Sequence, residues 1–219
     1  MTKRLPDASP LNDDGVIGIP PAAGSDEHLR ETPLASDWIL RGNFLQVKRD
    51  RVALPDGREA SREYIRHPGA AVIVPLLDDG RVLLERQYRY PLGRVVTEFP
   101  AGKLDPQEPP LRCAMRELLE ETGYTAREWA YAGVMHNAIA YSDERIEIFF
   151  ARGLRAGERR LDEGEFLDLV ELSEAELDRM ALHGELSDAK SLVCLQWLQR
   201  WRAGAWPLQW MTADEAATR

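Results

Sequence analysis

The stretch that decides the fold runs from Gly102 to Tyr124 and reads GKLDPQEPPLRCAMRELLEETGY. Its second half predicts a helix from Leu111 to Thr122, because apolar residues recur there at helical spacing and Gly123 follows in a position that commonly ends helices. We expect one face of this helix to pack against a sheet through Leu111, Ala114, Met115 and Leu118.

The other face of the predicted helix carries carboxylates. Glu117, Glu120 and Glu121 stand at i, i+3 and i+4 and therefore share one side. Like charges at this spacing destabilise a helix by roughly 0.2–0.5 kcal/mol per pair, so the cluster calls for a counter-charge. A divalent cation, which prefers oxygen ligands, would supply it, and Arg116 could orient a carboxylate. A solvated acidic face is the alternative for so short a cluster.

The spacing of the whole segment favours the cation. The segment satisfies the pattern G-x5-E-x7-R-E-U-x-E-E-x-G-U, where U is aliphatic, at Gly102, Glu108, Arg116, Glu117, Leu118, Glu120, Glu121 and Gly123. The one departure is Tyr124, at a position that concerns packing. The chain therefore resembles the Nudix hydrolases, a family of metal-dependent enzymes.

Other segments resemble the ADP-ribose pyrophosphatase branch of that family, from about Trp38 to Arg200. They are HPGAAVIVPL, RQYR, EFPAGK, YSDERIEIFFA, DEGEF and ELSDAKSLVCLQWL. The resemblance implies a Nudix α/β/α sandwich with a mixed sheet, preceded by a small N-terminal antiparallel β-sheet. It also implies Mg²⁺-dependent hydrolysis of the pyrophosphate in a nucleoside diphosphate derivative, with ADP-ribose cut to AMP and ribose 5-phosphate.

Alternatives remain for the function. The substrate could be a nucleotide sugar such as GDP-mannose, and the chain could be a Nudix-fold module that senses nucleotides without cutting them. The intact glutamates at 117, 120 and 121 speak against the second. Hydrolysis of RNA 5′ ends is a third reading, which the acidic net charge disfavours.

The resemblance also assigns the metal site residue by residue. Glu117, Glu121 and the backbone carbonyl of Ala101 would bind Mg²⁺, with Mn²⁺ as the alternative ion. Glu120 would support the same cluster as a catalytic residue, and Glu165 in the segment DEGEF matches a further metal ligand.

The general base and the substrate contacts follow from the same resemblance. Glu163 matches the base that activates water, and Glu144 of YSDE is the rival base and otherwise a substrate contact. Arg89 is the phosphate-binding candidate, because a guanidinium can hold phosphate oxygens with two parallel hydrogen bonds. Arg62 and Phe44 are the remaining substrate-binding candidates.

The branch further implies a homodimer that exchanges the N-terminal sheet, so that Arg62 would lie on or near the base in the partner's pocket. Some members have an aromatic residue directly after the RG of the first strand, whereas this chain has Asn43 and only then Phe44. The identity of the base therefore stays open.

The chain divides into four parts by composition and pattern. We expect a flexible N-terminal arm over 1–34, an N-terminal β-sheet region over 35–66, a Nudix domain over 67–203 and a C-terminal tail over 204–219. Five prolines in the first part explain the expected flexibility.

Local patterns predict further elements of the main domain. AAVIVPLL and RVLLERQY, separated by Asp78, Asp79 and Gly80, predict a β-hairpin. Further strands are expected at 95–99, 129–135, 145–151 and 166–171. Ser173 with Glu176 predicts a capping box for one late helix, and Ser187 is the expected N-cap of the next.

Composition restricts location and partners. The net charge of −9 argues against broad binding to nucleic acid, and no apolar run is long enough to cross a membrane. We expect a cytoplasmic enzyme whose partner is a small nucleoside diphosphate derivative. Cys113 and Cys194 are expected to be packed, reduced thiols, since their spacing suggests neither a metal site nor a disulfide framework.

Overall fold

The computed structural model describes residues 26–217, which form two compact units. The first includes the described residues up to Arg41 together with Val47–Glu63, and the second comprises Gly42–Gln46 and everything from Tyr64 onward. Most of the expected N-terminal arm lies outside the described residues. No helix between residues 26 and 217 is long and apolar enough to cross a membrane.

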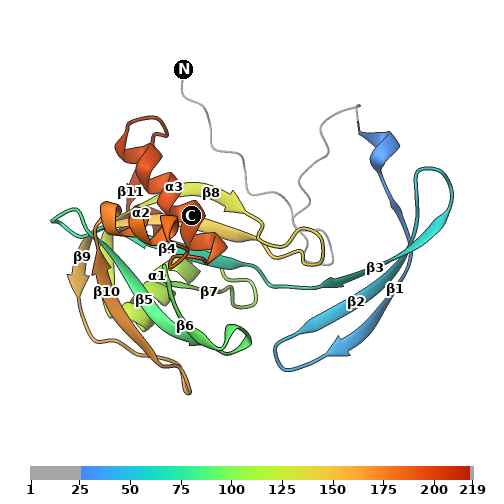
Figure 1. Ribbon diagram of the computed structural model, residues 1–219, viewed down its shortest axis with the longest axis horizontal. Helices are drawn as coiled ribbons and strands as arrows, with labels where there is room; N and C mark the ends of the chain where they lie inside the picture. The colour runs from blue at the N-terminus through green and yellow to red at the C-terminus, as the bar shows by residue number, and fades with distance from the viewer. Residues whose placement is uncertain (1–25, 218–219) are drawn as a thin grey trace. The chain divides into compact units, whose positions relative to one another are not determined.

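The first unit contains a short 3₁₀ helix, η1 (Glu27–Leu29), and a three-stranded sheet in the order β1-β2-β3. Its strands are β1 (Thr32–Arg41), β2 (Gln46–Ala53) and β3 (Glu59–Ile65). The sheet begins three residues earlier than expected and includes Pro33. A proline is tolerated there because β1 is an edge strand, where a residue without an N–H need not pair. The short connections between the strands give the expected antiparallel order (Figure 1).

The second unit is built on a five-stranded mixed sheet in the order β11-β8-β9-β4-β7. Its strands are β4 (Ala70–Pro75), β7 (Ala101–Lys103), β8 (Tyr124–Met135), β9 (Ile146–Ala156) and β11 (Trp210–Thr212). β4 runs parallel to β9, and the other pairs are antiparallel. A smaller antiparallel sheet has the order β10-β5-β6, from β10 (Leu167–Leu172), β5 (Val82–Arg89) and β6 (Arg94–Glu98).

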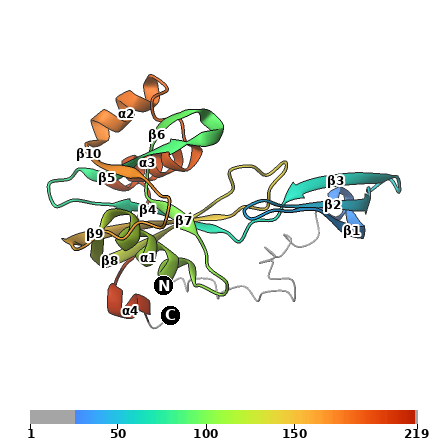
Figure 2. The same cartoon turned by 90° about the horizontal axis from the view of Figure 1, so that it is seen from below.

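Helices and the smaller sheet cover the two faces of the five-stranded sheet. One face packs against α1 (Pro110–Thr122) through a cluster that includes Cys113, Leu118 and Trp129. The opposite face packs against β5, α2 (Glu174–Leu182) and α3 (Ala189–Arg202) in a larger core. Figure 2 shows the central strands between these two layers. The expected α/β/α sandwich is confirmed.

The predicted hairpin between β4 and β5 is wrong. Only the residues beside the turn pair, through a single bridge between Leu76 and Val82, and the strands then enter different sheets. The sequence pattern is the same for either outcome, because β4 is buried throughout and β5 is buried over its first half. This separation leaves room between the two sheets for the side chains described below.

One further expectation needs correction. The N-cap of α3 is Asp188, whose side chain accepts from the N–H of Ser191, whereas the Ser187 hydroxyl accepts from Arg94. The segment expected as a C-terminal tail includes β11, which joins the central sheet, and α4 (Ala213–Ala217). The capping box of α2 is confirmed, with Ser173 and Glu176 bonded reciprocally.

The remaining strands match their predicted positions within a few residues at most ends. β8, however, starts at Tyr124 and not near Trp129, directly after the helix end at Gly123. Gly123 has a φ of 76°, the left-handed conformation that lets the chain leave α1 without strain. Between β5 and β6 lies the short helix η2 (Tyr90–Leu92). Both cysteines are buried and free, as expected.

Candidate active site

Arg116 organises the carboxylates of α1. Its Nε and Nη2 donate to the two oxygens of Glu108 at 2.9 and 2.8 Å, which is a bidentate pair. Its Nη1 donates to Glu117 at 2.7 Å and to Glu120 at 3.0 Å. The hydrogen bond from Arg116 holds the pKa of Glu108 below its usual value. The expected orienting role of Arg116 is confirmed.

Glu117 and Glu121 turn toward the interior from the same helix. The side chain of Glu117 is 13% exposed, and Glu121 is 5% exposed. Burial raises the pKa of Glu117 to about 6, although Arg116 opposes the shift. Burial also raises the pKa of Glu121, and the nearby charges of Glu85 and Glu117 raise it further. The site therefore holds more negative charge than its own arginine neutralises.

The backbone of β7 lies directly against these two carboxylates. The N–H of Ala101 donates to Oε2 of Glu121 at 3.1 Å. A Cβ on Gly102 would lie 1.9 Å from the carboxyl carbon of Glu117, so this position needs glycine for close approach. The structure thus brings together Ala101, Glu117 and Glu121, the three residues that the sequence assigns to the metal.

This donor set fits a divalent cation that shares its ligands with water and substrate. Mg²⁺ is usually bound by one or two carboxylates, and its other ligands are waters and substrate phosphates. Between residues 26 and 217, no three His, Cys, Asp or Glu side chains are arranged to hold an ion by themselves. The carboxylates of α1 and the backbone of β7 therefore suit an ion whose remaining ligands are waters and substrate oxygens.

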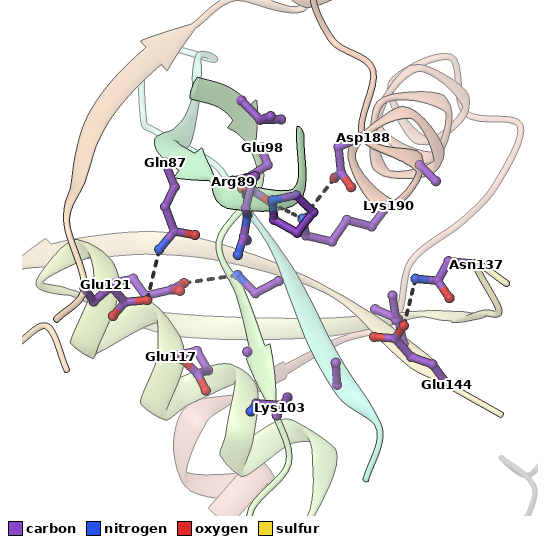
Figure 3. Close-up of a pocket in the computed structure, with 18 of the residues that line it drawn as sticks. Gln87, Arg89, Glu98, Lys103, Glu117, Glu121, Asn137, Glu144, Asp188 and Lys190 are labelled. Atoms are coloured by element: carbon purple, nitrogen blue, oxygen red, sulfur yellow. Dashed lines mark hydrogen bonds and ion pairs between the residues drawn. The ribbon is translucent and has the colours of Figure 1, made fainter. Parts of the chain in front are cut away.

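A cavity of about 840 Å³ adjoins the carboxylates (Figure 3). Its lining comes from α1, the start of α3, η2, the strands β4, β5, β6, β7 and β9, and five connecting segments. Pockets for small-molecule ligands usually measure about 300–1,000 Å³. The cavity can therefore receive a ligand of that class with one end against α1.

A network of charges forms the wall of the cavity opposite α1, with Glu98 and Lys190 largely buried and Arg89 partly exposed. Arg89 Nε donates to Glu98 at 2.6 Å, and Lys190 contacts both Glu98 and Asp188, the latter at 3.0 Å. Burial opposes the charge of Lys190, but Asp188 and Glu98 outweigh it and raise the pKa of the ammonium. Figure 3 shows Arg89 and Lys190 beside Glu98. The predicted phosphate-binding residue Arg89 thus lines the cavity and is held by an acid.

The loop before β10 contributes one of its two predicted glutamates to the cavity. Glu165 lines it and accepts from Gln87 Nε2 at 3.3 Å. Glu163 is exposed and is not among the lining residues, although Asp162, its neighbour, is. The N–H of Glu165 donates to the carbonyl of Asp162 at 3.0 Å, which closes a tight turn at Glu163 and Gly164.

Glu144, the rival base, lies in another part of the cavity. Its carboxylate accepts from Asn137 Nδ2 at 2.8 Å, and His67 Nε2 is 3.6 Å away. Figure 3 shows Glu144 and Asn137 well apart from Glu117 and Glu121. This position suits contact with a substrate group distant from the carboxylates of α1.

The two remaining candidates belong to different units. Phe44 lines the cavity, and Lys103 Nζ lies 4.4 Å from the centre of its ring. Arg62 belongs to the first unit, where its Nε donates to Glu31 at 2.9 Å. Phe44 is therefore placed with the other cavity residues, while Arg62 is held within its own sheet.

Sequence reasoning missed several cavity residues and one buried acid. Glu98, Lys103, Asp188 and Lys190 all lie in segments quoted only for their resemblance, EFPAGK and ELSDAKS. Glu85 is fully buried in β5, where it follows the apolar run of Val82, Leu83 and Leu84. The sequence gives no local signal for this burial, because Glu85 begins the polar half of β5, in which Arg86, Gln87 and Arg89 follow.

Comparison with known proteins identifies two regions. The NUDIX domain family matches residues 66–193, and the nucleoside diphosphate sugar hydrolase N-terminal domain family matches residues 31–65. The boundary falls at the end of β3.

Similar proteins share most of this architecture. An ADP-ribose pyrophosphatase of Bacillus subtilis is 35% identical over 173 residues, which cover 78% of this chain and 94% of that protein. An ADP-ribose pyrophosphatase of Mycobacterium tuberculosis is 37% identical, covering 73% and 78%. A solved structure of an ADP compounds hydrolase has a TM-score of 0.73 at 25% identity and covers 80% of this chain and 95% of that one.

The close approach at Gly102 gives a test of the carboxylate geometry. In Gly102→Ala the new methyl group should displace the Glu117 carboxylate, the movable end of a side chain, and leave the backbone unstrained. We expect Mn²⁺ affinity, measured by electron paramagnetic resonance of free Mn²⁺, to fall at least about 10-fold, as for loss of a ligand's support. The thermal midpoint should change little. Gly80→Ala, at a turn outside the cavity lining, is the control: its φ of 87° strains any side chain, so its thermal midpoint should fall while its Mn²⁺ affinity stays unchanged. Unchanged affinity in Gly102→Ala would contradict this geometry.

Proposed function

Because the chain belongs to the Nudix hydrolase family, we propose that it hydrolyses ADP-ribose to AMP and ribose 5-phosphate with Mg²⁺ as its metal ion. The family supports the reaction class, which is cleavage of the pyrophosphate in a nucleoside diphosphate derivative. The relatives named ADP-ribose pyrophosphatase support the choice of substrate. The observation that carries the proposal is the pair Glu117 and Glu121, buried against Ala101 and Gly102 beside the cavity.

The protein's part in the reaction is to hold the pyrophosphate and a water in place. Glu117, Glu121 and Ala101 would hold the metal ion, and Arg116 orients the Glu117 carboxylate by donating a hydrogen bond to it. The chemistry that a bound Mg²⁺ supplies is neutralisation of phosphate charge and acidification of a water. Arg89 can bind phosphate oxygens from the opposite wall.

The proposed general base is Glu163, two residues before Glu165 in the same loop. Water attacks one phosphorus, its proton passes to the base, and the bond from that phosphorus to the bridging oxygen breaks. Glu165 is proposed as a further metal ligand and Glu120 as a support of the cluster. The position of Glu144 beside Asn137 favours a substrate contact over the rival role of base.

A nucleotide sugar such as GDP-mannose is the second candidate substrate. It is favoured by the match of residues 31–65 to the nucleoside diphosphate sugar hydrolase N-terminal domain. The candidate for contact with the base is Phe44, whose ring faces the cavity and is held by Lys103. An aromatic ring can stack on any nucleobase, so this contact does not choose between adenine and guanine.

We also propose that the enzyme is a homodimer whose N-terminal sheets take part in the contact. All ten residues of β1 are exposed, among them Trp38, Ile39 and Leu40 with 38–46% of their surface accessible. An exposed apolar strand of this length is the kind of surface that a second chain covers. Arg62 would then act in the partner's pocket.

Substrate choice is tested with a panel. The purified protein with Mg²⁺ is incubated with ADP-ribose, GDP-mannose, UDP-glucose and dinucleotides, and nucleoside monophosphate is measured. We expect the highest kcat/KM for ADP-ribose. Glu121→Gln should lower it at least about 100-fold, because even loss of a group supporting a metal ligand costs 10–100-fold. Glu128→Gln, which removes an acid paired with Arg152 outside the cavity, is the control. Nucleotide binding without turnover would overturn the proposal and favour a sensing module.

The roles of the loop glutamates are tested by separating catalysis from metal binding. Glu163→Gln should lower kcat by about 10²-fold or more, the usual contribution of a general base, with unchanged Mn²⁺ affinity. Glu165→Gln should weaken Mn²⁺ binding, and Glu144→Gln should raise KM more than it lowers kcat. Loss of Mn²⁺ binding in Glu163→Gln, or a kcat defect confined to Glu144→Gln, would reassign the base.

The dimer is tested by sedimentation velocity. The wild type should sediment with twice the 24.8 kDa mass of one chain. Trp38→Ala should shift the protein toward the monomer, because it removes the large apolar side chain that the second chain would cover. Glu59→Lys, a charge change elsewhere on the same sheet, is the control. A monomeric wild type at micromolar concentration excludes the proposed contact.

A further inference from the structure

Glu85 is a fully buried carboxylate that the roles proposed so far do not use. It lies in β5, and its cross-strand neighbour in β6 is Glu98, so two glutamates face the same side of the smaller sheet. Like charges directly opposite in a sheet are destabilising. The next residues of β5 on that side, Gln87 and Arg89, line the cavity. Glu85 therefore lies on the same face of β5 as these two cavity residues, deeper in the protein.

Among the described residues, Glu85 alone has a buried carboxylate in which both oxygens lack a hydrogen-bond partner. The other three buried glutamates are each held. Glu98 contacts Arg89 and Lys190, Glu121 accepts from Ala101, and Glu147 accepts from Tyr131.

The surroundings of Glu85 are strongly acidic. Glu98, Glu121 and Glu165 all act on it or are acted on by it electrostatically. The cations nearby, Arg89 and Lys190, already contact Glu98. Burying a charge without a partner costs several kcal/mol. The described residues leave no free cation beside Glu85, so a positive partner would have to come from outside the chain.

We propose that Glu85 is a positioning residue of the metal site, contributed by β5 in addition to the ligands from α1 and β7. In this role its carboxylate accepts hydrogen bonds from waters in the ion's coordination shell. The inference rests on the proposed function, since it needs the ion that Glu121 would bind. Mg²⁺ keeps several waters when it binds to proteins, and such outer partners typically change metal affinity 10–100-fold.

The test compares Mn²⁺ affinity in two glutamine variants. Glu85→Gln keeps the size of the side chain and removes the charge, and we expect its dissociation constant for Mn²⁺ to rise 10–100-fold. Glu147→Gln is the matched control, because it removes another buried glutamate that is held by Tyr131 and lies outside the cavity lining. Its dissociation constant should stay within about 2-fold of the wild type, as expected away from the site.

Thermal unfolding gives a second measurement. Without metal, Glu85→Gln should be at least as stable as the wild type, because an unpartnered buried charge has been removed. The increase in melting temperature caused by Mg²⁺ should be smaller than in the wild type. If Glu85→Gln does not fold, Glu85→Leu replaces it as an apolar residue of similar size, with the same expectation for Mn²⁺.

These outcomes separate the inference from the proposed function. Wild-type affinity for Mn²⁺ in either folded Glu85 variant overturns the inference, even when the wild type hydrolyses ADP-ribose. A wild type that binds Mn²⁺ more tightly than Glu85→Gln but cuts no member of the substrate panel supports the inference and overturns the function.

Discussion

The contact between two carboxylates of α1, the partly buried Glu117 and the buried Glu121, and the backbone of β7 is the constraint on which the rest of the site depends. The Glu117 carboxylate occupies the space beside Gly102 where a side chain would lie, and the N–H of Ala101 is bonded to Glu121. Helix α1 can be held this close only because its other face packs on the central sheet through Leu118. The same packing that stabilises the domain therefore places unneutralised charge beside a cavity.

The cavity has two walls with different electrostatics. On the α1 side, Arg116 alone donates hydrogen bonds to three glutamates. This leaves an excess of negative charge that suits a divalent cation. On the opposite side, Arg89 and Lys190 are held by Glu98 and Asp188 and so keep fixed positions. A pyrophosphate with its metal ion between these walls would meet an acidic surface through the ion and a guanidinium directly.

The sequence predicted the structure correctly where a pattern is compatible with only one local structure. The spacing of glutamates along one helix face and Gly123 at its end predicted α1 and its polar side correctly. It was insufficient where several folds satisfy the same pattern. Two adjacent apolar strands predicted a hairpin, yet β4 and β5 enter different sheets. Lys190 and Glu85 were missed because their importance comes from partners distant in sequence, or from the lack of them.

In the proposed mechanism, substrate pyrophosphate and metal ion meet at Glu117 and Glu121. The most direct measurement is a crystal structure of the protein with Mn²⁺ and a non-hydrolysable methylene analogue of ADP-ribose, in which anomalous scattering locates the ion. We expect an Mn²⁺ peak bound by Glu117, Glu121 and the carbonyl of Ala101, with the phosphonate groups between that ion and Arg89. An analogue bound in the cavity with no ion at these residues would contradict it.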